Sequence, residues 1–517
     1  MVSSTSSRRS AFRMRAGLSL SASLLTLGLA APAWADATPE CNVGSDLDTT
    51  ECGVDAVATG LGATAVGDSA EASDNFSTAV GEGAAATDSS ATAIGAQSVA
   101  SQLDATAIGT SSAAIGGSST ATGSNSAAVG DGSTSNGAYA IASALHATAI
   151  GAQSTASGYD STATGYGSVA SDHDATANGA DAEAEGAYSS VFGSESFASG
   201  EYSSAFGAGS NATGTLATAT GAQSFASGEV STATGGSAYA TGDHATATGG
   251  SSTASGDNTT ATGYGSVASG EDGTATGAFA EATGNNSTAT GTAAEASGAG
   301  GTATGKSSTA SGNTSTATGI GSTASGFRST TTGGFSLASG EGASSYGYGS
   351  FAEAEGATAL GSSASASGVN SVALGAGSVA DQDNTVSVGS AGNERRIVNV
   401  AAGVDPYDAV NVSQLNSVLS NLTGDFDARI AGLEGGLERL DRQTSGGIAA
   451  AMALGGAILP PGVDTAISFN LATYRGEQGF SFQIASRVSE RVWLSGGVAG
   501  STVKGSTGGR AGVTFGW

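Results

Sequence analysis

The residues best suited to acid–base or metal chemistry in this sequence are three histidines, His146, His173 and His244. Only His173 has a carboxylate on both sides, in Asp172-His173-Asp174, a grouping that could touch a metal ion. Each histidine stands in a variable turn position of a repeat, where a single histidine beside acids is more often simply solvated. The sequence has no G-x-S-x-G nucleophile motif and no phosphate loop. We therefore expect no catalytic, cofactor or metal site and no enzyme activity.

Two cysteines, Cys41 and Cys52, are the remaining candidates for chemistry. In an exported chain such a pair could close a small disulfide loop. Two free thiols would be unusual outside the cytoplasm, and a metal site would need further ligands. A disulfide is therefore the favoured interpretation of the pair.

The first 35 residues have the layout of a secretory signal peptide. Four arginines precede an apolar run over residues 16–31, and Ala33-Trp34-Ala35 offers a small-x-small cleavage site. A retained membrane anchor is the weaker alternative, because the apolar run is short and interrupted by serine. The sequence thus predicts export, with 1–35 removed and 36–62 left as an N-terminal segment that holds the cysteine pair.

Composition argues against an ordinary globular enzyme. The 517 residues include 84 Gly and 5 Pro, only 12% are charged, and the formal net charge is −28. Collagen is excluded because Gly does not recur every third residue, and a strict period argues against disorder. Between Asp36 and Ser390 the only basic side chains are Lys306 and Arg328. This acidic stretch would repel nucleic acid and anionic lipid, so it forms a solvated surface, or else one that receives a basic partner or loosely bound cations.

Glycine marks a strict 14-residue period from Gly67 to Gly389. Alanine stands five residues after each ladder glycine from Gly67 to Gly375, which gives a column from Ala72 to Ala380, and nearly always two residues before a ladder glycine, as at Ala93. A fixed period this short predicts stacked coils, each with two strands of four or five residues and tight turns. The alanine columns should face inward, since little more than a methyl group fits between two strands. Coils about 4.8 Å apart would build a rod of roughly 115 Å.

The residue just before each ladder glycine varies more. It is Ile at 94, 108 and 150, Phe at 192 and 206, Leu at 360 and 374, and Thr through most of the middle. Strand alternation places this side chain opposite the inner alanine. A thin solenoid buries little apolar area by itself, so this outer face is expected to meet another chain.

Two motifs that follow the repeat resemble a known family. Residues 395–403 contain R-x-I-x-N-V-A-A-G, and residues 408–415 contain D-A-V-N-V-x-Q-L. They are similar to the neck of trimeric autotransporter adhesins related to the Yersinia adhesin YadA. The resemblance implies a homotrimer in which a neck (393–415) joins a left-handed parallel β-roll head (63–392) to a coiled coil. The central Thr residues before Gly depart from the usual Ile or Val of that family.

The spacing of apolar residues predicts a coiled-coil stalk over residues 412–445. These residues alternate in steps of three and four from Val412 to Leu440, with one extra four-residue step between Phe426 and Ile430. Such a stutter locally unwinds a left-handed supercoil. A helix packed on a globular domain is the alternative. Glycines at 432, 435 and 436 are expected to weaken its end.

Residues 446–517 begin with a small-residue helix and continue as four segments that alternate apolar with small or polar residues, which is typical of outer-membrane strands. Four strands cannot close a spanning barrel, whereas three chains would supply twelve. The family resemblance extends to this anchor, on the hairpin 473–477 and the terminal aromatic residue. It implies contact with outer-membrane lipid and the barrel-assembly machinery, and a role in export. The expected membrane-facing residues are Ile467, Phe469, Leu471, Tyr474, Phe480, Phe482, Ile484, Val492, Leu494, Val513, Phe515 and Trp517.

The overall expectation is a mainly β, surface-exposed, non-enzymatic protein whose head binds matrix, host cells or other surfaces. One segment is similar to the family's collagen-associated head motif and gives the candidate ligand residues Asn370, Ser371, Val372, Ala373, Leu374, Gly375 and Ser378. Two alternatives remain on the same anchor. Stacked Thr-Ala-Thr strands, as at 232–234 and 246–248, could order water or bind ice, and the fibre could be a passive spacer or coat.

Overall fold

The computed structural model describes residues 41–43 and 48–517. The expected signal peptide, residues 1–35, lies outside the described residues. The chain forms two units, with the boundary after Arg395, and we describe each separately.

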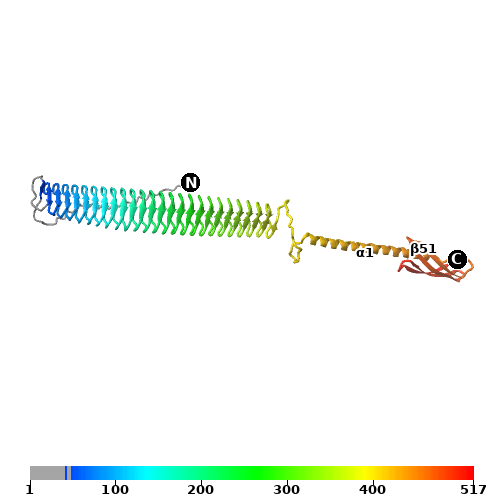
Figure 1. Cartoon of the computed structure of the whole chain (residues 1–517). Helices are drawn as coiled ribbons and strands as arrows, with labels where there is room; N and C mark the ends of the chain where they lie inside the picture. The colour runs from blue at the N-terminus through cyan, green and yellow to red at the C-terminus, as the bar shows by residue number, and fades with distance from the viewer. Residues whose placement is uncertain (1–40, 44–47) are drawn as a thin grey trace. The chain divides into compact units, whose positions relative to one another are not determined.

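The first unit is a parallel β-solenoid (Figure 1). Each 14-residue coil contributes one three-residue strand to one sheet and one two-residue strand to a second sheet. The three-residue strands are the even-numbered ones from β2 (Thr50–Cys52) and β4 (Thr64–Val66) to β48 (Val372–Leu374). The two-residue strands are the odd-numbered ones from β3 (Val57–Ala58) to β49 (Val379–Ala380), and β50 (Val386–Ser387) closes the series.

Neighbouring coils are in register, residue i above residue i+14. Thr64 pairs with Thr78 and Ala65 with Ala79 in one sheet, and Ala72 pairs with Ala86 in the other. All of these pairings are parallel. The expected parallel solenoid of 14-residue coils is confirmed.

The strands are shorter than the four or five residues expected from the sequence, because the turns take more of each coil. In the first turn, Gly67 has φ +133° and Ser69 has φ +55°, and in the second turn Phe76 has φ +59°. These conformations lie outside the β region, so only three and two residues per coil remain in the ladders.

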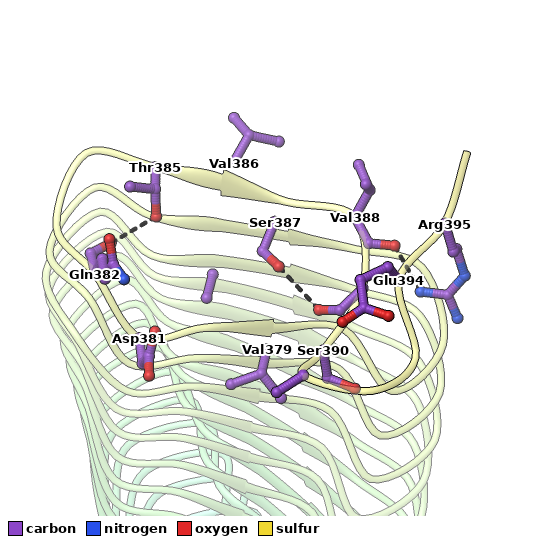
Figure 2. A pocket seen from close by; sticks show the side chains of 13 residues that line it. Val379, Asp381, Gln382, Thr385, Val386, Ser387, Val388, Ser390, Glu394 and Arg395 are labelled. Carbon is purple, nitrogen blue, oxygen red and sulfur yellow. Dashed lines mark hydrogen bonds between the residues drawn. The ribbon is translucent and has the colours of Figure 1, made fainter. Parts of the chain in front are cut away.

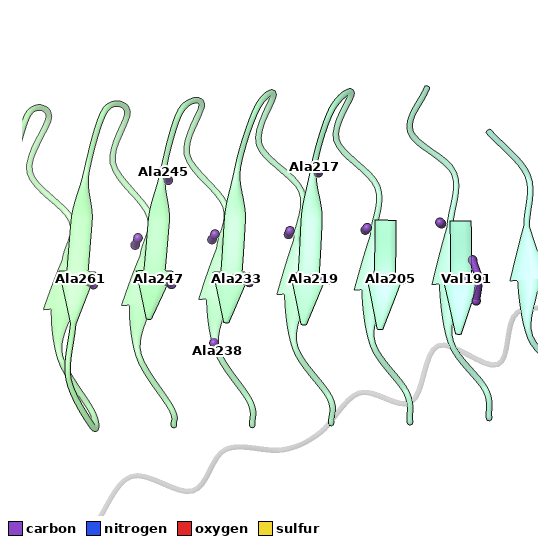
Figure 3. Close-up of a cluster of buried hydrophobic side chains, with 14 of the residues drawn as sticks. Val191, Ala205, Ala217, Ala219, Ala233, Ala238, Ala245, Ala247 and Ala261 are labelled. Carbon is purple, nitrogen blue, oxygen red and sulfur yellow. The ribbon is translucent and has the colours of Figure 1, made fainter. Parts of the chain in front are cut away.

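Alanine fills the interior as predicted. The inner columns are fully buried, and Figure 3 shows one of them, from Val191 through Ala205, Ala219 and Ala233 to Ala261. Buried serines stand directly after many of the turns. Many of them donate a hydrogen bond to a carbonyl of the preceding turn, as Ser98 Oγ does to Gly95 O at 2.8 Å. The core of the described coils is therefore made almost entirely of alanine and serine side chains, and Val191, Thr259 and Thr331 are its largest fully buried members.

The solenoid begins earlier than residue 63, the expected start of the head. Strand β2 pairs in parallel with β4, and Gly53 has φ +131°, the conformation of the ladder glycines 14 residues on. A short strand, β1 (Cys41–Val43), pairs antiparallel with β2 and covers the first coil. Cys41 and Cys52 lie opposite each other in this pair and are joined by a disulfide.

The second unit contains one helix and one sheet. Helix α1 (Val412–Ala453) runs through the expected stalk and the small-residue segment as a single element, without a break at the three glycines. Strands β51 (Thr465–Tyr474), β52 (Glu477–Ser489), β53 (Val492–Ser501) and β54 (Thr507–Phe515) form an antiparallel sheet in sequence order. One helix and four antiparallel strands agree with the predicted fold class.

Candidate functional site

The third residue of each three-residue strand, which stands just before the ladder glycine, varies between coils and points outward. We call the row of these side chains along the head the outward rank. In β8 (Thr92–Ile94) the middle residue, Ala93, is buried, whereas Ile94 is 39% exposed. Phe206 and Leu374 hold the equivalent place and are 39% and 43% exposed. In the single chain, the coils with an apolar residue at this position therefore have an uncovered apolar surface.

In the central coils both outward positions of this strand are threonine. Thr232 pairs with Thr246 and Thr234 with Thr248 in the parallel ladder. The outward rank is therefore polar in the middle of the head and more apolar in the flanking coils. In the middle it runs beside a second row of threonines at the first strand position.

The structure divides the candidate ligand residues 370–378 between the surface and the interior. Ser371, Ala373 and Ser378 are fully buried. Gly375 faces the chain that leaves the solenoid, since a Cβ there would lie 3.1 Å from Arg395 Nη1. Only the surface members of the segment, among them Leu374, remain available to a ligand.

Arg395 closes the C-terminal end of the solenoid, a role that the sequence motif does not reveal. Its Nη1 donates to Ser378 Oγ at 2.8 Å and to Val388 O at 2.7 Å, and its Nη2 donates to Ala376 O. Figure 2 shows Arg395 and Glu394 at the rim of the hollow where the last coil ends, with Val379 and Val386 lining it. Arg395 thus satisfies acceptors that no further coil would satisfy.

Three side chains of the second neck motif hold the start of α1. The Asp408 carboxylate accepts N–H groups of Val404 and Asp405 at 2.9 and 3.0 Å, and these bonds, Asp405 first, lower the pKa of Asp408. Asn411 caps the helix and forms a capping box with Gln414. Gln414 also binds both backbone groups of Gly403, each at 2.9 Å.

The apolar seam of α1 is uncovered in the single chain. Leu415, Leu422 and Leu437 are 60%, 52% and 68% exposed. An uncovered stripe of this length is a surface for other helices.

The C-terminal sheet separates apolar from polar side chains. In β52 the apolar members Phe480, Phe482 and Ile484 are exposed, while Ser481 and Gln483 are buried. The apolar residues pair across strands, as Phe469 does with Phe482. Most of the expected membrane-facing residues share this exposure; the exposed members are Ile467, Phe469, Leu471, Phe480, Phe482, Ile484, Leu494, Val513, Phe515 and Trp517. Tyr474 and Val492 are half-buried.

The polar face of the sheet binds the end of α1. Ser481 Oγ donates to Ala453 O at 2.6 Å, and Gln483 Nε2 donates to the carbonyls of Ala453 and Gly455 at 3.1 and 3.0 Å. Arg510 Nη1 donates to Leu454 O at 3.1 Å. These strand side chains satisfy carbonyls that the helix leaves free at its C-terminus.

Helix and sheet also fit closely at one glycine. A Cβ at Gly479 would lie 2.1 Å from Ala449 O, so no larger residue fits between β52 and the helix. Ala449, Ala450 and Ala453 are buried at this contact. The small-residue stretch predicted after residue 446 is therefore the part of α1 that packs on the sheet.

His146 and His173 each lie beside a single carboxylate. His146 Nδ1 lies 3.0 Å from Asp160 Oδ1, and His173 Nδ1 lies 2.5 Å from Asp174 Oδ2. Within 41–43 and 48–517, no group of three or more metal-ligating side chains comes together. Among the same described residues, no helix is both long and apolar enough to cross a membrane.

Three family models match the chain. The YadA head domain repeat matches successive stretches between residues 58 and 391, which together make up more than half of the chain. The coiled stalk of trimeric autotransporter adhesins matches residues 396–436, and the YadA-like membrane anchor domain matches residues 459–517.

Two relatives share part of the sequence. The autotransporter adhesin NhhA of Neisseria meningitidis is 32% identical over 124 residues, which are 24% of this chain and 19% of NhhA. The autotransporter adhesin EhaG of Escherichia coli O157:H7 is 36% identical over 107 residues, 20% of this chain and 6% of EhaG. The matched segments thus span less than a fifth of either relative.

One solved structure, titled as the collagen-binding domain of the Yersinia adhesin YadA, is 26% identical and covers 43% of this chain and 86% of its own. Its TM-score is 0.14, too low to indicate a shared arrangement in space.

Proposed function

Because the chain belongs to the YadA-like family of trimeric autotransporter adhesins, we propose that its solenoid head attaches the cell to surfaces, matrix or other cells. The family places the protein at the outer membrane and cell surface as a homotrimer, and indicates a structural protein and not an enzyme. The observation that supports attachment is the head itself, a long regular surface of exposed variable side chains on a core made mostly of alanine.

The C-terminal unit would anchor and export the head. Its four strands have an exposed apolar face, and the outer strands β51 and β54 each pair on one side only. Three copies would supply twelve strands and leave no open edge. We infer that residues 446–517 of three chains form such a barrel in outer-membrane lipid, inserted by the barrel-assembly machinery, after a signal peptide (1–35) directs export across the inner membrane.

The head ligand is a host, matrix or surface component. Collagen is one candidate, through the surface side chains of segment 370–378, such as Leu374. Three of the seven residues of that segment are buried, which leaves a small contact area. The head's remaining outward ranks offer far more surface for a ligand.

Attachment is tested with cells of a Gram-negative host that display the full chain. A variant that lacks residues 221–332 removes eight whole coils and keeps the ladder glycines in phase. We expect display of both chains at equal levels, measured with an antibody to the stalk, and loss of binding to matrix-coated surfaces by the shortened chain. Unchanged attachment would instead indicate a passive spacer or coat.

A further inference from the structure

The two turns of each coil differ in charge. Over the described coils, the first turn, which starts at the ladder glycine, has acidic residues only at 55, 68, 82, 181 and 195. The second turn, which is Asp74–Phe76 in one coil, has acidic residues in most coils, for example Asp131, Glu201 and Glu271. Because the coils stack in register, these second turns form one continuous edge, which we call the acidic edge.

Some of these acids have a packing role. Asp131 Oδ1 accepts the N–H of Gly117, and Asp257 Oδ1 accepts the N–H of Asp243, in each case one coil away. The neighbouring turn residues, which include Asp160 and Glu201, vary from coil to coil and project at the surface. Coil stacking therefore accounts for part of the charge on the acidic edge.

A run of rings lies on the acidic edge. His146, Tyr159, His173, Tyr188 and Tyr202 come from five successive coils, and each ring contacts the next. The centroids are 6.1, 5.1, 5.2 and 4.7 Å apart, with two near-parallel pairs and two tilted pairs. We call this run the aromatic ladder.

The tyrosine rings of the aromatic ladder are exposed to solvent. Tyr159, Tyr188 and Tyr202 are 42%, 43% and 50% exposed. Tyr188 and Tyr202 also have φ of +59° and +57°, a conformation that favours Gly, Asn or Asp. Equivalent turns elsewhere have Asn258 and Asn286, so the fold does not require a tyrosine at these two positions.

We propose that the aromatic ladder binds an arginine-bearing basic segment of a protein partner, an assignment that rests on the attachment role proposed for the head. A guanidinium group can lie against a tyrosine ring while it donates to carboxylates such as Asp160 and Glu201. Each of the five coils supplies a ring, and the turns at 158–160, 172–174 and 200–202 also supply a carboxylate, so one edge offers ring and carboxylate contacts to several arginines of an extended peptide. The near absence of basic residues in the head leaves this edge with few cations of its own.

Charge also argues that this edge stays outside the trimer. Three copies of the acidic edge placed together would repel one another across a low-dielectric contact. The apolar rank that includes Ile94 and Phe206 is the better surface for contact between copies. The aromatic ladder would then remain accessible to a partner in the assembled protein.

The test uses the full chain in detergent micelles and a fluorescent octa-arginine peptide, with octa-lysine for comparison. The ladder variant is Y159N/Y188N/Y202N, in which each Asn occurs naturally at the same turn position of another coil. The control variant Y139N/Y166S/Y264S removes three tyrosines from the first turns, each more exposed than the ladder tyrosines, and again introduces residues found there in other coils. A second variant, D160N/D174N/E201Q, keeps the rings and removes three charges.

We expect the wild-type chain to bind octa-arginine more tightly than octa-lysine. The ladder variant should weaken octa-arginine binding about tenfold, from three lost ring contacts. The charge variant should also weaken it, and the control should not. Equal binding of the two peptides, or equal effects of the ladder and control variants, would overturn the proposal. Neither result bears on attachment, which the coil deletion tests by itself.

Discussion

Ladder glycines face the backbone of the next coil, where a hydrogen atom is the only side chain that fits. At Gly235 φ is +125°, and a Cβ would lie 2.7 Å from the carbonyl carbon of Gly249. Positive φ and close approach are independent reasons for glycine, and both recur through most of the ladder. This double constraint explains why the period tolerates no other residue.

The first prediction compares neighbouring glycines. Gly235→Ala should destabilise the local coils by about 1–3 kcal/mol or more, because it adds both backbone strain and a clash. Gly236→Ala is the matched control, since a Cβ there would meet only Ala222 O at 3.8 Å. Amide hydrogen exchange should quicken around residues 221–263 in the first variant alone. Equal protection in both would contradict the role given to the ladder.

The second prediction concerns Asp408. Because the N–H groups of Asp405 and Val404 favour its charged form, the folded pKa lies below that of a free aspartate. The stabilisation is complete above the unfolded pKa and is lost as the pH falls through the lower folded value, so the neck turn should loosen only in acid, below about pH 4. A carbon NMR titration of labelled aspartates, assigned with Asp408→Asn, measures this. A midpoint at or above the free value would refute it.

At the scale of the element, α1 shows two different surfaces. Its first part has an uncovered apolar seam, and its end packs small residues against β52. The sheet holds that end through side chains on its polar face, chiefly Ser481, Gln483 and Arg510. The same helix can therefore join other helices at one end and bind strands at the other.

The third prediction concerns the bound end of the helix. Gln483→Ala leaves the carbonyls of Ala453 and Gly455 with fewer donors and should cost about 1–3 kcal/mol. Thermal unfolding in detergent, followed by circular dichroism, should show a lower midpoint. Gln478→Ala, at an exposed position of the same strand, should behave like the wild type. A shift of the same size in both would show that the effect is not specific to the helix end.

The fourth prediction concerns the seam. Leu422→Asp places a charge in each copy at the apolar stripe and should weaken association of the three chains. Asn421→Asp adds the same charge at a residue outside the seam and serves as the control. Chemical cross-linking of the full chain in detergent should give fewer trimers for the first variant. Unchanged trimer yield would mean that association does not depend on this stripe.

At the scale of the whole molecule, repeat length determines whether the head folds. Deleting residues 221–234 removes one coil and returns Gly235 to the ladder directly after Thr220. Deleting residues 221–232 removes nearly as much chain but shifts the ladder out of phase. We expect the first variant to resist surface proteolysis and the second to be cleaved near the junction. Similar resistance would contradict the register described for the coils.

Much of this architecture could be predicted from the sequence because identical coils repeat the same constraint. Ala93 and its equivalents could be assigned inside, and Ile94 outside, from alternation and period. The strand lengths could not, because positive φ at non-glycine residues such as Phe76 leaves no clear mark in the sequence. The contacts of Arg395 and Gln483 could not be predicted for a different reason. Arg395 binds Ser378, 17 positions away, and Gln483 binds carbonyls 28 and 30 positions away, and no repeat in the sequence relates these residues.

Both the N-terminal and the C-terminal end of the solenoid are contacted by a segment of the chain outside the repeat. Strand β1 runs antiparallel across the first coil and is tied to it by the disulfide, and Arg395 occupies acceptors of the last coil. A stack of identical coils without such ends would offer free strand edges to other molecules and could grow into fibrils. We therefore expect the length of the head to be set by the number of coils in its sequence, because these end contacts oppose pairing with further chains.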